Sequence, residues 1–409
     1  MSTDKLNKTL RGDLDALNQK GTAKGAEMVI TGIKPAEGAN GPRYFVDGKG
    51  GQEFIKMNSN SYLGLSMRPD MIAAEEDAAK NFGVGPGAVR FISGTHRPHI
   101  ELERKLAAFM GREAAMLFSS AYVTSMGVLV PLASAETVFV SDELNHNCII
   151  QAMRLSRPAG KAVYKHNDMA DLDAKLSESV GKGKRALVVT DGIFSMRGDN
   201  APLDKLVEIC HKYDDKFEDG VITVVDDSHG IGALGQTGRG TEEYTGCTVD
   251  ILIGTLGKAF GVNGGFVVSS ATIVEYLRET APMYIYSNPI TVAEARTAMK
   301  ALEILESGEG RKILKHLAAM TRRFENGLTE LGYETIPGPH PVVPLMVRDT
   351  KRTSDIVAFL TANGVLATGL NFPVVPKGAE EIRFQVCGDH TEADIDTVLG
   401  VLKKYKETH

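Results

Sequence analysis

Seven short apolar runs, rich in β-branched residues, alternate with stretches of helical periodicity between residues 114 and 268. Strands that alternate with helices predict a parallel or mostly parallel sheet with helices on both faces. Ligands of such sheets bind at the carboxyl ends of the strands. The predicted fold is therefore α/β, with a binding site along one edge of the sheet. The predicted strands are residues 114–118, 137–140, 162–164, 185–190, 221–225, 251–253 and 265–268.

The two ends of the chain predict smaller units. Helical spacing of leucines at positions 6, 10, 14 and 17 predicts an amphipathic helix in a packing arm, and the Gly-rich residues 21–51 predict short strands and turns. Near the other end, a long helical region from 291 to 328 precedes strands at 341–347 and 381–386 and helices at 354–363 and 392–405. The predicted domains are an arm at 1–53, a large α/β domain at 54–290 and a small α+β domain at 291–409.

Composition excludes several classes of partner. The 43% hydrophobic content can bury a large core, and the net charge of -6 comes without a basic block, so nucleic acid and anionic membranes are not expected partners. The four cysteines lie far apart without CxxC pairing, which argues against a zinc site or a disulfide framework and favours a reducing cytoplasm. We expect no bound metal, and no apolar run is long enough to predict a membrane span.

A glycine-rich motif at residues 230–235 has to be weighed as a dinucleotide site. The letters GIGALG match GxGxxG directly after a predicted strand, and Asp250 lies at the expected spacing beyond them. The fingerprint requires a helix that opens within the glycines, whereas residues 235–240 (GQTGRG) continue as a loop. We therefore reject the dinucleotide interpretation.

Two segments indicate the chemistry. Lys258 lies in GTLGKAFG, about thirty residues after Asp226 in VVDDSH. A lysine amine can form a Schiff base with pyridoxal phosphate, and a carboxylate can keep its pyridine nitrogen protonated. Taken alone, such a lysine is more often a surface charge, and such an aspartate is as often a turn cap. A carboxylate at the end of an apolar strand needs a cationic or hydrogen-bonding partner, which favours the cofactor interpretation.

Ordered motifs along nearly the whole chain resemble those of the α-oxoamine synthases. These are fold-type I pyridoxal phosphate enzymes that join an amino acid to an acyl-CoA. Besides the two segments above, the resemblance rests on residues 58–65 (NSNSYLGL), 90–95 (RFISGT), 141–146 (SDELNH), 190–196 (TDGIFSM), 286–288 (YSN) and 382–383 (IR). It implies a fold-type I transferase with a large, mostly parallel α/β domain and a smaller C-terminal α+β domain.

The resemblance implies catalytic roles at four positions. Lys258 would hold the cofactor covalently and later move the substrate proton. Asp226 would pair with the pyridine nitrogen, and His229 would bond to the phenolic oxygen. His146 would stack on one face of the ring and leave the other face open.

The resemblance also implies how the cofactor phosphate is held. The turn formed by Ser120, Ala121 and Tyr122 would offer backbone amides at a helix start. Thr255 would add its hydroxyl, and Ser287 would reach across from another subunit. The implied assembly is therefore a homodimer with active sites at the subunit interface.

Three further positions complete the implied site. Ser195 would support the cofactor near Asp226 and His229. Arg383 could hold the amino-acid carboxylate as a planar bidentate donor, and Asn60 would assist it.

Within the family, residues 226–229, 238–244 and 368–378 are most similar to members that condense glycine with acetyl-CoA. The expected reaction gives 2-amino-3-oxobutyrate and CoA. Residues 83–89 and Ser61 depart from that pattern, which leaves the acyl-chain length open. A decarboxylating synthase that uses serine, alanine or glycine with a longer acyl-CoA is the alternative. A noncatalytic scaffold and an aminotransferase are the other classes to be tested.

Overall fold

The computed structural model describes residues 2–20, 22–23, 25–372 and 374–409. Pro373, within the predicted segment 368–378, therefore lies outside the described residues, as do Met1, Gly21 and Lys24 of the predicted arm.

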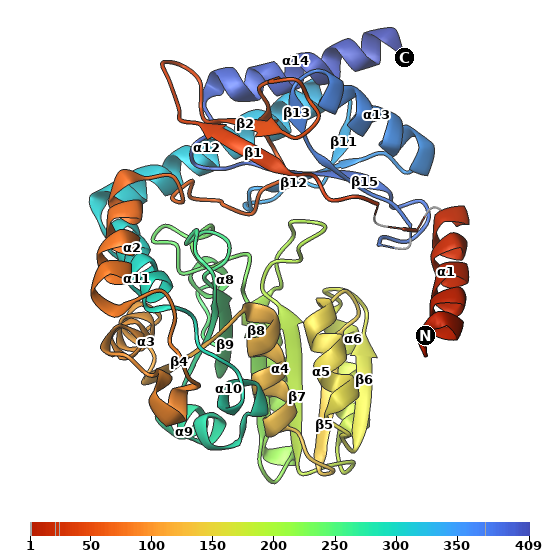
Figure 1. The fold of residues 1–409 in the computed structure, drawn as a ribbon. Helices are drawn as coiled ribbons and strands as arrows, with labels where there is room; N and C mark the ends of the chain where they lie inside the picture. Colours follow the sequence, from red (N-terminus) through yellow and green to blue (C-terminus); the bar gives the residue numbers. More distant parts are fainter. Residues whose placement is uncertain (1, 21, 24, 373) are drawn as a thin grey trace.

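A seven-stranded sheet forms the centre of the larger part of the molecule (Figure 1). Its strand order is β4-β10-β9-β8-β7-β5-β6, and only β10 runs antiparallel to its neighbours. All seven predicted strands are confirmed, and the sheet is mostly parallel as predicted. The strands are β4 (Ala114–Phe118), β5 (Thr137–Asp142), β6 (Gly160–Tyr164), β7 (Arg185–Asp191), β8 (Val221–Asp226), β9 (Ile251–Thr255) and β10 (Gly265–Ser269).

Helices cover both faces of this sheet, which explains why its central strands are apolar along their length. Val224 of β8 belongs to the apolar cluster that α4 and α5 form on the face seen in Figure 1. The next residue, Val225, belongs to the cluster formed with α3 and α11 on the opposite face. The helices of this part are α2 (Pro69–Phe82), α3 (Arg97–Phe109), α4 (Ala121–Leu132), α5 (Asn147–Leu155), α6 (Met169–Ser179), α7 (Leu203–Tyr213), α8 (Thr241–Thr245), α9 (Ala271–Thr280) and α10 (Pro282–Ile285), with a π-helical turn at Arg90–Gly94 and a 3-10 turn at Asp214–Lys216.

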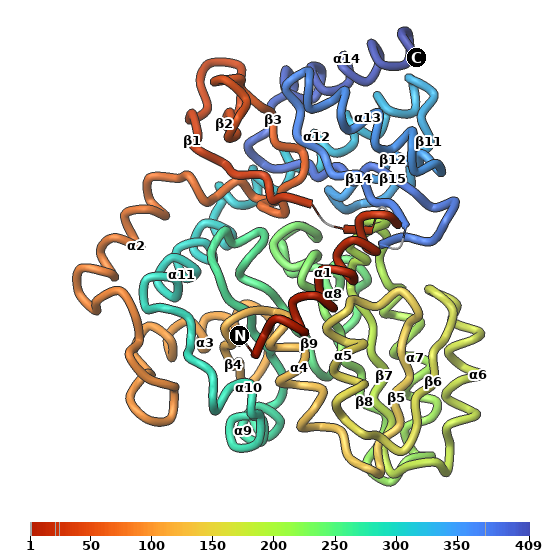
Figure 2. The backbone as a smooth tube through the Cα atoms, turned by 45° about the vertical axis from the view of Figure 1, so that its right-hand side comes forward, coloured from red at the N-terminus to blue at the C-terminus, as the bar shows by residue number. Residues whose placement is uncertain are grey.

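A smaller antiparallel sheet of order β11-β12-β15-β14 organises the C-terminal part. It confirms the two predicted C-terminal strands, and α13 and α14 confirm the two predicted helices. The separate pair β3 and β13 links an early segment to this part, where the β1-β2 hairpin also lies (Figure 2). The elements are β1 (Ile30–Lys34), β2 (Arg43–Val46), β3 (Ile55–Lys56), β11 (Glu334–Thr335), β12 (Val342–Met346), α13 (Thr350–Ala362), β13 (Val365–Leu366), β14 (Thr368–Leu370), β15 (Glu381–Gln385) and α14 (Glu392–Thr408).

The predicted single helical region at 291–328 is two helices, α11 (Val292–Glu306) and α12 (Gly308–Glu330). Ser307 separates them because its backbone is extended and its hydroxyl accepts hydrogen bonds from the amides of Glu309 and Gly310. Such a side-chain cap starts a new helix. α11 packs on α2 and α3, whereas α12 continues toward the small sheet.

The N-terminal helix forms as predicted but does not pack on its own chain. α1 (Asp4–Gln19) has no buried residue, and the predicted stripe stays 44% to 57% exposed at Leu6, Leu10, Leu14 and Leu17. α1 stands beside the body of the molecule in Figure 1. The packing prediction is therefore wrong for the single chain, because the apolar spacing fixes the helix but not its partner.

Within the described residues, none of the helices is both long enough and apolar enough to cross a bilayer.

Candidate active site

Side chains from the carboxyl end of the large sheet meet in one cavity. Asp191 and Asp226 end β7 and β8 and are partners in register, and Lys258 follows shortly after β9. The described residues that line the cavity are Ala121, Tyr122, His146, Cys148, Asp191, Ile193, Ser195, Asp226, Ser228, His229 and Lys258. More than half of the predicted site residues are among them.

Three donors hold the carboxylate of Asp226, which is only 6% exposed. The Ser125 hydroxyl donates to Oδ2 at 2.9 Å, and the Cys148 thiol lies 3.6 Å from the same oxygen. The amide of Ser228 donates to Oδ1 at 3.1 Å. A buried charge is costly unless it is hydrogen-bonded, and these contacts also fix its direction.

Asp191 brings a second carboxyl group to the cavity. Its Oδ2 accepts the amide of His146 at 3.0 Å, and its own amide donates to Asn145 Oδ1 at 2.8 Å. Burial and the nearby charge of Asp226 raise the pKa of Asp191 well above its ordinary value. Sequence reasoning placed Asp191 beside a strand end but gave it no role. Two adjacent carboxyl groups favour either a proton on one of them or a cation beside them. The amine of Lys258 lines the same cavity.

The amine of Lys258 is buried and has a lowered pKa. Burial lowers its pKa to about 8, although the charges of Asp226 and Asp191 oppose that shift. A larger fraction of the amine is therefore neutral near pH 7 than for an exposed lysine. A neutral amine can act as a nucleophile or a general base.

His146 lies in the cavity wall as a neutral ring. It caps the start of α5, where its Nδ1 accepts the amide of Cys148 at 3.3 Å. Its ring meets that of Tyr122 edge to face, with 6.3 Å between the ring centroids. Burial lowers the pKa of His146. A flat uncharged ring in this place suits the predicted stacking role.

A hydrogen-bonded chain joins His229 to Arg383 across the two parts of the molecule. The Tyr62 hydroxyl lies 2.7 Å from His229 Nδ1 and 3.3 Å from Asn60 Oδ1. Arg383 donates to the same Asn60 oxygen at 3.1 Å and to the carbonyl of Ser195 at 3.0 Å. The predicted substrate residues are thus connected to the cavity.

Sequence reasoning missed two residues that hydrogen-bond to His229. Tyr62 lies within the NSNSYLGL motif, so its position was visible but its partner was not. His340 donates from Nε2 to the carbonyl of His229 at 2.8 Å. Burial lowers the pKa of His229 well below its ordinary value, so its ring is neutral.

Five predicted residues are not among those that line the cavity: Asn60 and Arg383, which are joined to it as described above, and the three residues predicted to hold the phosphate, Ser120, Thr255 and Ser287. Ser120 caps α4 by accepting the amide of Val123 at 3.3 Å. Thr255 donates to the carbonyl of Gly264 at 3.2 Å, and the hydroxyl of Ser287 donates to the carbonyl of its neighbour, Asn288, at 3.5 Å. The first turn of α4, with Ala121 and Tyr122 on the cavity, keeps the helix start available for an anion.

His166 steadies the segment that carries Ser195. Its Nδ1 lies 3.2 Å from Asp142 Oδ1 and its Nε2 lies 3.1 Å from Asp199 Oδ2. Its ring also packs edge to face on Phe194, with 4.3 Å between the ring centroids. Burial opposes charging of the ring, but the hydrogen bonds to Asp142 and Asp199 outweigh burial and raise the pKa of His166 to about 9.

We expect this histidine to make stability depend on pH. Since the pKa of His166 rises from 6.5 to about 9 on folding, its contribution is complete below pH 6.5 and is lost as the pH rises through about 9. The loss amounts to at most about 3 kcal/mol of the free energy of unfolding. Urea unfolding of the wild type and of His166→Asn between pH 6 and 9.5 measures it. His211→Asn, on the outer side of α7, is the control, and parallel pH profiles for wild type and His166→Asn would contradict the assignment.

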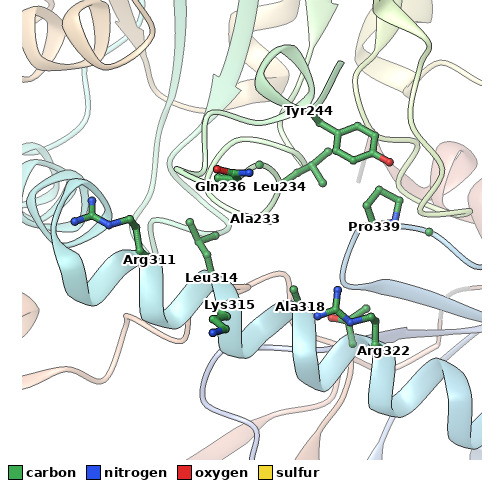
Figure 3. A pocket seen from close by; sticks show the side chains of 13 residues that line it. Ala233, Leu234, Gln236, Tyr244, Arg311, Leu314, Lys315, Ala318, Arg322 and Pro339 are labelled. Atoms are coloured by element: carbon green, nitrogen blue, oxygen red, sulfur yellow. The ribbon is translucent and has the colours of Figure 1, made fainter. Parts of the chain in front are cut away.

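A larger cavity of about 520 Å³ lies elsewhere, between α12 and the loop that follows His229. Figure 3 shows Arg311, Lys315 and Arg322 on α12, across the cavity from Gln236 and Tyr244. It contains none of the predicted site residues. The loop opens no helix before α8, so the rejection of a dinucleotide site agrees with the structure.

This chain is similar to known proteins in sequence and in structure. Residues 52–402 match the profile of the aminotransferase class I and II family. The chain is 37% identical over 398 residues to 8-amino-7-oxononanoate synthase of Petrotoga mobilis, which covers 97% of this chain and 96% of that protein. It is 40% identical over 403 residues to mitochondrial 2-amino-3-ketobutyrate coenzyme A ligase of Bos taurus, covering 98% and 92%. The structure of a lysine-to-alanine variant of serine palmitoyltransferase from S. paucimobilis with a bound PLP-myriocin aldimine aligns with a TM-score of 0.87 and 26% identity, covering 100% of this chain and 98% of that chain.

Proposed function

Because the chain belongs to the aminotransferase class I and II family and, within it, to the α-oxoamine synthases, we propose that it condenses glycine with acetyl-CoA. The products are 2-amino-3-oxobutyrate and free CoA. The family makes it a pyridoxal phosphate-dependent acyl-CoA:amino acid C-acyltransferase. One observation carries the proposal: the Lys258 amine and the Asp226 carboxylate line one cavity, to which a hydrogen-bonded chain joins Arg383.

The residues of the cavity fit the cofactor. Asp226 offers a fixed carboxylate for a protonated pyridine nitrogen, and His146 offers an uncharged face for the ring. The start of α4 at Ala121 and Tyr122 suits the phosphate, and Lys258 supplies the amine that holds the aldehyde carbon. When bound, the cofactor withdraws electrons from the α-carbon of the amino acid.

Side chains of this protein have separate roles in the proposed reaction. Arg383 and Asn60 hold the carboxylate of glycine, which orients the α-carbon toward Lys258. Once the amino group of glycine has taken its place, the freed amine of Lys258 would remove one α-proton, and the α-carbon would attack the thioester carbonyl of acetyl-CoA. A carbon–carbon bond would form, the carbon–sulfur bond would break, and CoA would leave as its thiol after taking up the proton held by Lys258. His229, held by Tyr62, keeps the cofactor oxygen in place during these steps.

The choice of glycine and acetyl-CoA rests on sequence similarity. Residues 226–229, 238–244 and the described part of 368–378 support it, as does the name of the Bos taurus relative. A second candidate is a decarboxylating synthase with a longer acyl donor, because the Petrotoga relative is almost equally similar. Product mass separates the two, since decarboxylation removes carbon dioxide.

We place the active site at the interface of a homodimer. Ser287 lies outside the cavity of its own chain, and the adjoining Tyr286 is 77% exposed. These residues suit a contact with the partner subunit's cofactor.

The test combines cofactor-loaded protein with glycine and acetyl-CoA and follows free thiol together with product mass. Thiol release with the mass of 2-amino-3-oxobutyrate, or of the aminoacetone formed by its decarboxylation, supports the proposal. Release only with longer donors supports the second candidate. Formation of an oxo acid from the amino acid without release of CoA thiol would indicate an aminotransferase. No turnover with any pair of amine and acyl-CoA would revive the noncatalytic interpretation.

Arg383→Ala is expected to weaken the use of glycine more than that of acetyl-CoA. Removing a charged hydrogen bond to the carboxylate costs about 1.5 to 3 kcal/mol, which corresponds to about a ten- to hundredfold rise in KM for glycine. Steady-state kinetics with each substrate varied in turn measure the change. Arg322→Ala, on the remote cavity, is the control. An unchanged glycine dependence would remove Arg383 from the substrate site.

A further inference from the structure

A second cleft opens beside the cavity of Lys258. It has a volume of about 320 Å³ and lies between the segment around Ser195 and the segment at 374–379. Ser195 lines both spaces, so the cleft adjoins the reacting groups. Its walls are mainly apolar and include Phe194, Met196, Met346 and Val375.

Two acidic residues line this cleft, and of these Glu143 is exposed and already accepts the amide of His166, whereas Glu381 is buried in the apolar wall. Glu381 lines the cleft and is 2% exposed, and no described residue hydrogen-bonds to its Oε1. Burial raises the pKa of Glu381 to about 8, although Arg383 and Arg197 oppose the shift, so the group is largely protonated at neutral pH. A buried polar atom without a partner is costly, and a ligand that supplies one removes that cost.

The position of Glu381 relates it to the substrate. Glu381 and Arg383 are alternate residues of β15, so their side chains share one face and lie roughly 7 Å apart along the strand. Since Arg383 is proposed to hold the glycine carboxylate, Glu381 lies close to the proposed substrate site.

The chemistry of the cleft selects among the groups that the proposed reaction brings there. Neither glycine nor an acetyl group fills a cleft of this size. The cleft offers no free cation to the phosphates at the nucleotide end of CoA, because Arg197, the cation among its described lining residues, is already paired with Asp199 at 2.8 Å. The pantetheine arm of the thioester is instead a chain of methylene groups that carries neutral amides. Its amides offer both a donor and an acceptor to a carboxyl group.

We propose that this cleft binds the pantetheine arm of the acyl-CoA, with Glu381 hydrogen-bonded to the amide nearest the sulfur. This inference rests on the proposed function. Glu381 is then a substrate-binding residue that selects CoA-type thioesters over simple ones. Its neighbour Glu380 has a different task, since Glu380 already accepts hydrogen bonds from Thr350 and Gly378.

Two model thioesters test this contact directly. S-Acetyl-N-acetylcysteamine carries the first amide of pantetheine, and S-pentyl thioacetate has the same length without it. We expect the wild type to prefer the amide thioester at least about tenfold in kcat/KM with glycine, and Glu381→Leu to lose that preference. Glu381→Gln should retain much of it, because an amide side chain also hydrogen-bonds. Glu380→Gln is the matched control and should leave the ratio unchanged.

Binding provides a readout that does not need turnover. Calorimetry with pantetheine and the cofactor-loaded protein should show at least about tenfold weaker binding to Glu381→Leu than to wild type. If wild type binds pantetheine but no acyl donor turns over with glycine, the proposed function fails and the cleft assignment stands. If turnover occurs but Glu381→Leu keeps both the thioester ratio and the affinity for pantetheine, the assignment is overturned. A change confined to the KM for glycine overturns it as well.

A rim variant covers the case in which Glu381→Leu does not fold. Val374 lies 42% exposed at the edge of the cleft, so Val374→Trp narrows the cleft without disturbing the core. It should raise KM for acetyl-CoA about tenfold and leave KM for glycine unchanged. Unaltered KM for acetyl-CoA in this folded variant would overturn the assignment.

Discussion

Lys258→Ala is expected to lose at least about a thousandfold in turnover, the upper part of the range for a general base. The loss follows from its position in the cavity, where burial lowers the amine pKa to about 8. No other lysine lines that cavity among the described residues. The first measurement is CoA thiol release. The second is exchange of the glycine α-protons with deuterium, followed by NMR, which reports proton removal without an acyl donor.

A matched lysine shows whether the effect is specific. Lys315→Ala removes an exposed lysine of α12 from the remote cavity and should leave both rates unchanged. Borohydride should fix the cofactor covalently on the wild type and on Lys315→Ala but not on Lys258→Ala. Normal exchange of the glycine α-protons by Lys258→Ala would contradict the role of Lys258 in removing the α-proton.

The positions of the main site residues could be predicted because they follow strands that are apolar along their length. A buried strand is a strong pattern, and parallel strands deliver their last residues to one edge of the sheet. Asp226 and Lys258 are therefore close in space despite their separation in sequence. The same reasoning reached Asp191 but could not show that it adjoins Asp226 in register.

Contacts between distant segments could not be predicted. Ser125 donates to Asp226 from inside α4, and its local sequence is that of an ordinary apolar helix. Tyr62 meets His229 only because the two parts of the molecule come together there. Glu381 resembles any charge at the start of a strand until its burial and its unpartnered oxygen are seen. Side-chain pairing across the fold is a tertiary property, which periodicity and local motifs do not encode.

The N-terminal helix and Ser307 illustrate two further limits. Helical spacing of leucines identifies α1, yet the spacing does not say which surface the apolar stripe meets. At Ser307 the opposite problem arises, because helical periodicity continues on both sides of a cap. The cap depends on one extended backbone conformation and two hydrogen bonds. Neither can be recognised from a serine within a helical pattern.

Asp226→Asn is expected to lower turnover about a hundred- to thousandfold while the cofactor remains bound through Lys258. The wild-type carboxylate is aimed by Ser125, Cys148 and Ser228, so its charge is fixed before the reaction starts. Removing one such preorganised group typically costs a factor of that size. An asparagine keeps the shape but not the charge, so it cannot keep a pyridine nitrogen protonated.

Proton exchange separates this electrostatic role from a structural one. Since Asp226 acts on the electron demand at the α-carbon, the rate of glycine α-proton exchange should fall by the same factor as turnover. Asp250→Asn is the control, because Asp250 lies at the opposite end of the same sheet and accepts hydrogen bonds from Thr223. If Asp226→Asn exchanged glycine protons at the wild-type rate but released CoA slowly, its carboxylate would act on the acyl transfer instead. If both rates stayed normal, the carboxylate would only cap the turn after β8, which is the plain structural reading of an aspartate in that place.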